Sequence, residues 1–296
     1  GSEMCIRDRP GAPSSVQLVV GFETKEFAAD FRPDTPTKQG DRSGSGGATL
    51  PIGGMYDVDE FFLEVGIPVT NDISVDAGFR SAEYSTGAET DSTKVGAYWT
   101  VNDNVSLRAS FQTAQRHASI SELYSAVSDG LVDLDNDPCS IQQNGSAATA
   151  TQAQCAATGL AANLYNTDLN SPADQYNIKG GGNPLVAPEE SESITIGAVI
   201  TPESVPGLTL TIDYFDITVE DGIGTVSAKT ALDKCVSTGT AQYCDLINRQ
   251  AVTGSLWLQG GYISQQLTNI GEESTSGVDL IFDYDMDTAY GPLTLE

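Results

Sequence analysis

Apolar and polar residues alternate over several segments of this sequence. From residue 59 every second position is apolar, and the alternation resumes after the polar residues 70–72 and again after 102–104. A period of two is typical of β-strands that have one apolar and one polar face. A soluble β-sandwich shows the same period, so the pattern predicts an all-β antiparallel fold and leaves its surroundings open. The alternating apolar positions are Phe61, Leu63, Val65, Ile67 and Val69; Ile73, Val75, Ala77 and Phe79; Val95, Ala97, Trp99 and Val101; Val105, Leu107, Ala109 and Phe111; Ile194, Ile196, Ala198 and Ile200; Leu208, Leu210, Ile212 and Tyr214; and Val278, Leu280, Phe282, Tyr284 and Met286.

Connection lengths separate a membrane barrel from a soluble sandwich. Predicted turns near 70–72, 102–104, 202–207 and 286–291 are short, whereas the connections at 31–57, 115–190 and 221–260 are long. Short and long connections largely alternate along the chain, with the short loop at 86–90 as the exception. Outer-membrane barrels have this asymmetry, because their periplasmic turns are tight and their extracellular loops are long. The lengths therefore favour an incomplete transmembrane β-barrel of about nine strands.

Composition and charge exclude some classes of protein. Fourteen Lys and Arg residues against 41 Asp and Glu residues give a net charge of −27, which repels nucleic acid. No stretch reaches the roughly 18 consecutive apolar residues that a membrane-spanning helix needs. Solubility or a salty habitat explains the acidity better than attraction of cations by the loops does.

The five cysteines fall into two close pairs and one outlier near the start. Cys139 with Cys155, and Cys235 with Cys244, each bracket a short polar segment, which predicts two loop disulfides in an oxidising compartment. Free buried thiols are the alternative. Residues 1–14 share no pattern with the rest of the chain and include Cys5, so we expect a non-native leader there and a partial barrel over 15–296.

Four segments resemble recurrent barrel segments of TonB-dependent receptors. Residues 104–124 are similar to a strand that ends in "RxPxixELY", and residues 181–202 to "GNPxLxPExSxSxTxGxxxxP". Residues 213–223 and 269–284 resemble the next two strands in order. The proline that usually follows the arginine is absent, since Ala118 and Ser119 stand there. The matching residues are Arg116, Ile120, Glu122, Leu123 and Tyr124, then Asn183, Pro184, Leu185, Pro188, Glu189 and Gly197.

This resemblance implies energy-coupled import of a scarce nutrient across the bacterial outer membrane. The ligand would be a small molecule such as a siderophore–iron complex, cobalamin or an oligosaccharide. Outer-membrane lipid and the TonB complex would be the partners, the latter through a plug domain that does not precede residue 15. About nine strands also fall short of the roughly 22 of a complete plugged transporter. The alternative is a passive porin-like or other surface β-barrel protein without TonB coupling.

The sequence offers no catalytic constellation and implies no cofactor or metal. His117 is the only histidine and follows Arg116, so we expect a loop histidine and no enzyme. Asp133, Asp135 and Asp137 alternate like the start of a calcium loop, but Pro138 replaces the required glycine. We expect Asp283, Asp285 and Asp287 to hydrate a lumen. The predicted ligand contacts in the long loops are Arg116, Tyr124, Tyr165 and Tyr176.

Overall fold

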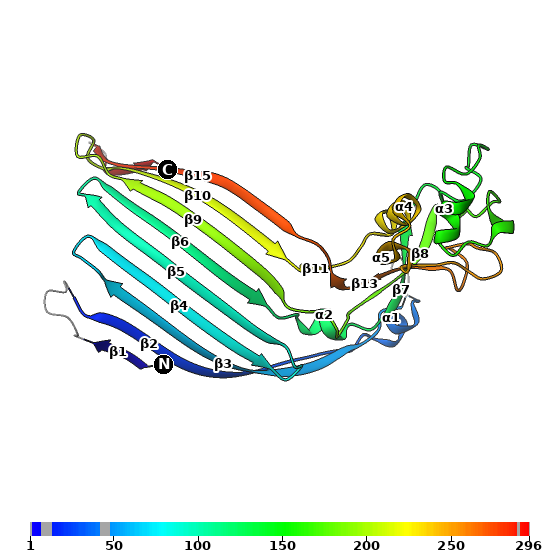
Figure 1. Ribbon diagram of the computed structural model, residues 1–296, viewed down its shortest axis with the longest axis horizontal. Helices are drawn as coiled ribbons and strands as arrows, with labels where there is room; N and C mark the ends of the chain where they lie inside the picture. The colour runs from blue at the N-terminus through cyan, green and yellow to red at the C-terminus, as the bar shows by residue number, and fades with distance from the viewer. Residues whose placement is uncertain (1, 7–13, 42–47, 289–290, 296) are drawn as a thin grey trace.

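The computed structural model describes residues 2–6, 14–41, 48–288 and 291–295. Its main body is one ten-stranded antiparallel sheet with the order β1-β2-β3-β4-β5-β6-β9-β10-β15-β16 (Figure 1). Within the described residues the sheet is not closed, since β1 pairs only with β2 and β16 only with β15. The strands are β1 (Ser2–Ile6), β2 (Val16–Phe31), β3 (Ile52–Pro68), β4 (Ile73–Tyr84), β5 (Glu89–Asn102), β6 (Val105–Arg116), β9 (Glu189–Ile200), β10 (Leu208–Glu220), β15 (Glu273–Thr288) and β16 (Gly291–Leu295).

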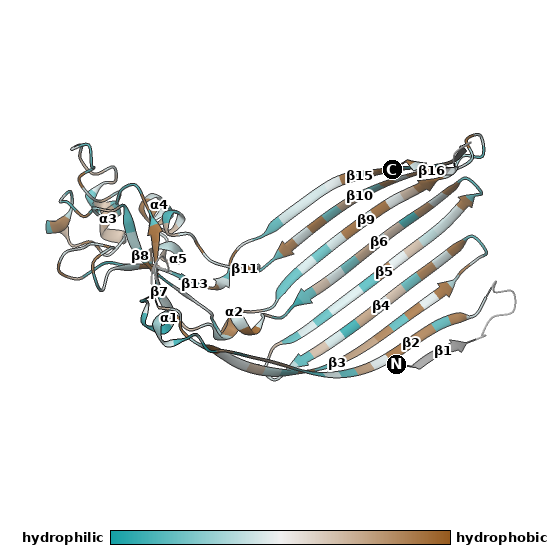
Figure 2. Cartoon of the chain, turned by 180° about the vertical axis from the view of Figure 1, so that it is seen from behind, coloured by the Kyte–Doolittle hydropathy of each residue, from teal (hydrophilic) through white to brown (hydrophobic). Residues whose placement is uncertain are grey.

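The register gives the sheet two chemically different faces. The predicted apolar positions share one face, where Leu63, Phe79 and Val95 are exposed. The other face carries charged side chains such as Asp76 and Lys94. Figure 2 shows the resulting stripes of apolar and polar residues along the strands. We call these the apolar face and the polar face.

The apolar band runs obliquely across the strands. Its edge towards the long loops is Phe61 on β3, but the partner of Phe61 on β4 is Ser81, so the edge there is Phe79, two residues lower. The partner of Phe79 on β5 is Thr93, and the edge again drops by two residues, to Val95. Barrel strands are tilted relative to the barrel axis, so an apolar band that is level with the membrane must cross the strand register obliquely.

Two long connections fold together into a compact unit beyond the strand ends, which we call the cap (Figure 1). Its four-stranded sheet has the order β12-β13-β8-β7, and the parallel β8–β13 pair joins the first connection to the second. The cap contains β7 (Ser128–Asp133), α3 (Gln152–Ala157), the 3-10 helix η1 (Ala162–Leu164), β8 (Gln175–Gly181), α4 (Ala228–Thr238), α5 (Ala241–Cys244), β12 (Ile247–Asn248) and β13 (Tyr262–Gln266).

Smaller elements lie where the cap meets the sheet. Helix α2 (Ile120–Tyr124) packs on the polar side of β3, where Leu123 and Tyr56 are buried together. The short pair β11 (Ile223–Gly224) and β14 (Thr268–Asn269) joins the start and end of the second connection. Helix α1 (Thr35–Gln39) lies in the connection between β2 and β3. Among the described residues, no helix is long and apolar enough to cross a membrane.

The structure corrects several predicted boundaries. The first long loop is 32–51 and not 31–57, because β2 extends to Phe31 and β3 begins at Ile52. The loop predicted at 115–190 spans 117–188, and the one predicted at 221–260 reaches residue 272, because β13 and β14 precede β15. The short exception is present as residues 85–88. Among the described residues the sheet has ten strands, one more than the roughly nine expected, and the added strand β1 lies within residues 1–14, the segment expected to be a leader.

Candidate functional site

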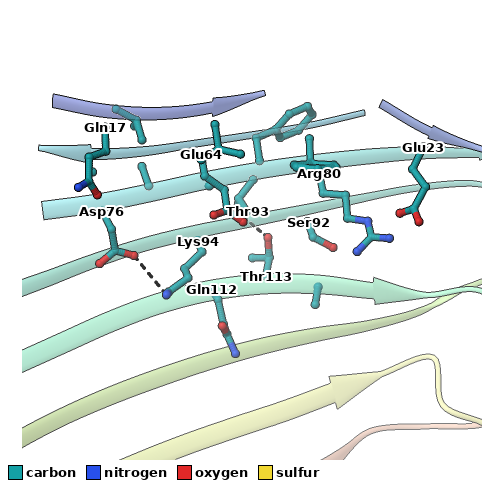
Figure 3. Close-up of a pocket in the computed structure, with 18 residues that line it drawn as sticks. Gln17, Glu23, Glu64, Asp76, Arg80, Ser92, Thr93, Lys94, Gln112 and Thr113 are labelled. Carbon is teal, nitrogen blue, oxygen red and sulfur yellow. Dashed lines mark hydrogen bonds and ion pairs between the residues drawn. The ribbon is translucent and has the colours of Figure 1, made fainter. Parts of the chain in front are cut away.

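The polar face is hollowed over strands β2 to β6. A cavity of about 700 Å³ lies there, lined by side chains that include Glu64, Asp76, Arg80 and Lys94 (Figure 3). The ammonium group of Lys94 lies 3.2 Å from the Asp76 carboxylate, and Gly96 leaves room for that carboxylate. Each of the five basic residues in β2–β6 pairs with a carboxylate, so this face is polar without presenting an uncompensated cation. The five are Lys25, Arg80, Lys94, Arg108 and Arg116.

A second polar cluster lies at the rim, where the chain passes between sheet and cap. The Arg116 guanidinium donates from Nε to Glu189 Oε2 at 2.5 Å and from Nη1 and Nη2 to the Glu122 carboxylate at 2.9 and 3.0 Å. The other Glu189 oxygen accepts from the backbone N–H of Ile223 at 2.7 Å. The hydrogen bonds from Arg116 lower the pKa of Glu122 to about 2. One guanidinium therefore links β6, α2, β9 and the start of the second connection.

Helix α2 is fixed by its own sequence and by close backbone contacts. Ser119 and Glu122 form a reciprocal capping box, which satisfies N–H groups at the start of the helix. The N–H of Asn183 donates to the Glu122 carbonyl at 2.8 Å. A Cβ on Gly182 would lie 2.8 Å from that carbonyl, so glycine is needed for this approach. Tyr124 likewise lies over Gly54 of β3, where a Cβ would overlap the ring.

Asn269 joins the remaining crossings. Its Nδ2 donates to the carbonyls of Asp221 at 2.6 Å and Ala187 at 3.0 Å, and its Oδ1 accepts from the Ala187 N–H at 2.8 Å. The next residue, Ile270, donates its N–H to the Gly222 carbonyl at 2.7 Å. All four family-like segments of the sequence therefore meet at this rim. We call the cluster the collar, which consists of Arg116, Glu122, Asn183, Ala187, Glu189, Asp221, Ile223 and Asn269.

The cap has an interior of its own. A buried ion pair joins its two connections, with Arg249 Nη1 2.6 Å from Asp137 Oδ2 and both side chains almost fully covered. Arg249 also donates to Thr158 Oγ1 at 2.7 Å and to the Gly254 carbonyl at 2.9 Å. The carboxylate of Asp137, whose spacing resembles the start of a calcium loop, is thus paired with an arginine.

Both predicted disulfide bonds are present in the cap. Cys139 is joined to Cys155 and Cys235 to Cys244, over sequence separations of 16 and 9 residues. The first bond lies in a small core with Leu160 and Leu169, and Cys235 lies in the larger core. The bonds therefore stabilise the interior of the cap.

His117 is the first residue of the loop that follows β6, and its side chain is half-buried. Its ring stacks on Tyr84 with centroids 4.0 Å apart and meets Tyr56 edge-on at 4.9 Å. Nε2 lies 2.9 Å from Thr86 Oγ1, which ties the short 85–88 turn to the rim. Burial lowers the pKa of His117, which favours the neutral imidazole.

The four predicted ligand contacts are not brought together. Tyr176 is fully buried, and burial raises its pKa to about 12, so it cannot touch a ligand on the cap surface. Tyr165 is half-buried and donates to the Ala150 carbonyl at 2.9 Å. Tyr124 packs over Gly54, and all three donor nitrogens of Arg116 are occupied at the collar. The sequence alone did not reveal the structural roles of Asp137, Arg249 and Asn269, since their partners are remote in sequence.

Comparison with known proteins identifies the family. Residues 11–295 match the family described as TonB dependent receptor-like, beta-barrel. The chain belongs to this family. A search of curated protein sequences finds no match.

Solved receptors share the fold. The siderophore receptor PirA from Acinetobacter baumannii is 15% identical with a TM-score of 0.53, over 91% of this chain and 32% of that one. A variant of the ferric enterobactin receptor PfeA from Pseudomonas aeruginosa, in complex with enterobactin, is 13% identical with a TM-score of 0.59, over 97% and 33%. The hemophore receptor HasR from Serratia marcescens is 13% identical with a TM-score of 0.52, over 92% and 37%. The chain thus spans about a third of the length of these receptors.

Proposed function

We propose that this chain is part of an outer-membrane receptor that imports a small nutrient molecule by TonB-coupled transport. The observation that carries the proposal is the sheet, which has an oblique apolar band on one face and a paired-charge polar face on the other. An exposed apolar face of this kind suits lipid, and a polar face suits a water-filled or plugged lumen. Family membership then favours coupled import over passive diffusion.

The cargo would be captured at the cap and the barrel mouth. PirA is a siderophore receptor, PfeA a ferric enterobactin receptor and HasR a receptor in complex with a hemophore and heme. A siderophore–iron complex is therefore the first candidate, ahead of cobalamin or an oligosaccharide. Energy would come from the TonB complex through a plug domain. Transport of this kind involves no covalent chemistry, so we propose a transporter and not an enzyme.

The structure changes how a loop deletion should be designed. Removing 125–180 alone would strip β7 and β8 from the cap and expose Ile263, which is fully buried. Removing 128–181 and 225–267 together, with short linkers, takes out the whole cap and leaves all eight residues of the collar. A receptor barrel that carries this chain should then still insert and run as a folded barrel, but should lose uptake of iron-loaded siderophore, heme or cobalamin.

Two results would contradict the proposal. Uptake with an unchanged KM after removal of the cap would show that the cap does not capture the cargo. Uptake that persists in cells without TonB would favour the passive-channel alternative. A matched control is deletion of 42–46, which shortens the connection between β2 and β3 and leaves the sequence of the cap unchanged.

A further inference from the structure

The two connections that form the cap act as one body. The β8–β13 ladder pairs residues of the two connections in parallel, and the larger core combines Tyr176 of the first with Leu256 and Ile263 of the second. The Asp137–Arg249 pair adds a buried link over a sequence separation of 112 residues. Separating the connections would expose these groups together. Any motion of the cap relative to the barrel is therefore a motion of the whole unit.

Four chain crossings connect this unit to the barrel. The first leaves β6, the second enters β9, the third leaves β10 and the fourth enters β15. Arg116 holds the first two crossings together and reaches the third through Glu189. Asn269 lies on the fourth crossing and bonds the second at Ala187 and the third at Asp221. With one side chain it ties three of the four crossings.

The hydrogen bonds of Asn269 need both halves of its amide. Its Nδ2 donates to two carbonyls that belong to different crossings, and its Oδ1 accepts an N–H. An aspartate would keep the acceptor but would place a negative charge against two carbonyl oxygens. An alanine would leave all three backbone groups without this partner. The geometry is therefore specific for an amide at this position.

We propose that Asn269 is a positioning residue, which sets the orientation of the cap over the barrel mouth without contributing to the interior of either. The cap cores and both disulfides share no residue with the collar, so the cap should remain folded when this tie is lost. The consequence for ligand capture rests on the proposed function. The orientation itself does not, and it can be measured without any ligand.

The test uses pairs of spin labels in a receptor barrel that carries this chain, with Cys5 replaced by Ser and the disulfides kept oxidised. One pair spans cap and barrel at Val252 and Asp103, and the other lies within the cap at Val252 and Ala147, all exposed positions. Asn269→Asp and Asn269→Ala should broaden the cap-to-barrel distance distribution by about twofold, because the side chain then no longer ties the fourth crossing to the second and third. The broadening in Asn269→Asp should be at least as large as that in Asn269→Ala. The distribution within the cap should stay as in the wild type.

The control is Asn163→Asp, the same chemical change at an exposed amide on η1 outside the collar. It should leave both distributions unchanged. Unchanged cap-to-barrel distances in both Asn269 variants would overturn the proposal. So would equal broadening within the cap, which would make Asn269 a folding residue of the cap. If orientation changes as expected but removal of the cap leaves uptake intact, the proposed function fails and the positioning role stands.

Discussion

The sheet and the cap bury their apolar side chains in opposite ways. On the sheet, Ile196 is 57% and Leu280 is 67% exposed, although both lie in the middle of long strands. In the cap, Tyr176, Leu256 and Ile263 are completely covered by other parts of the cap. The sheet forms a single layer with no second layer against its apolar face in the part of the chain that the structure describes, whereas the cap packs helices against a small sheet (Figure 1).

This difference shows where each region obtains its stability. A single-layer sheet with exposed Leu, Ile and Phe is stable only in surroundings that cover that face, and lipid does so. The cap, by contrast, has an interior of its own. Two disulfides, a buried ion pair and two cores stabilise it. One region of the chain therefore exposes apolar side chains as a membrane β-barrel does, whereas the other buries them as a soluble domain does.

The largest expected effect comes from breaking the buried ion pair. Arg249→Met leaves the Asp137 carboxylate buried without its cation, which should reduce the free energy of unfolding of the cap by about 3–5 kcal/mol. Urea unfolding followed by Trp257 fluorescence, in a Trp99→Phe background, measures it. The added change Asp137→Asn should recover part of the loss, because a neutral amide is easier to bury. The exposed ion pair Lys229–Asp233 is the control. If Lys229→Ala reduced the free energy of unfolding as much as Arg249→Met, the buried pair would have no special role in the cap.

The next effect distinguishes the two faces of the sheet with neighbouring residues. Ile196→Lys puts a charge in the apolar band and should destabilise the barrel in lipid by about 2–4 kcal/mol. Thr195→Lys puts the same charge on the polar face, beside Ser110, and should cost much less. Folding into lipid vesicles, followed by the heat-modifiable gel shift, compares them. If the two variants were equally destabilised, the assignment of faces would be wrong.

Removing the Cys139–Cys155 bond should weaken the cap and leave the sheet unaffected. The closed loop has a sequence separation of 16 residues, for which chain entropy gives up to about 3 kcal/mol. The change Cys139→Ser with Cys155→Ser tests this by urea unfolding of the cap. The shorter Cys235–Cys244 loop should give a smaller loss. Peptide mapping without reductant that found all four thiols free would refute both bonds.

The smallest effect concerns the collar and depends on pH. The hydrogen bonds from Arg116 hold the pKa of Glu122 at about 2, below its ordinary value of 4.5. The stabilisation that ionised Glu122 gives to the collar is therefore fully present above pH 4.5. It is lost as the pH falls through about 2. Amide exchange of α2 should therefore accelerate over that interval in the wild type and less in Glu122→Gln. Ser119→Ala, which removes the other half of the capping box, should cost about 1 kcal/mol at neutral pH.

The strands and their faces could be predicted from the sequence. A period of two follows from backbone geometry alone, so Leu63, Phe79 and Val95 could be assigned to one face without any partner. The short turns and the two cysteine pairs were also local features, since each pair is separated by few residues. The family-like segments gave the order of the later strands. These signals fixed the fold class and the positions of most strands.

The cap and the collar were decided only by tertiary structure. Asp137 lies 112 residues from Arg249, and Asn269 lies 82 residues from Ala187 and 48 from Asp221. Nothing local distinguishes Tyr176, which was expected at a ligand and is buried, from an exposed tyrosine. A polar residue in a long loop has no periodic pattern, so its environment depends on which remote segment folds against it. The sequence therefore determined which residues form strands and which side of each strand is apolar, whereas long-range packing determined which loop residues are structural.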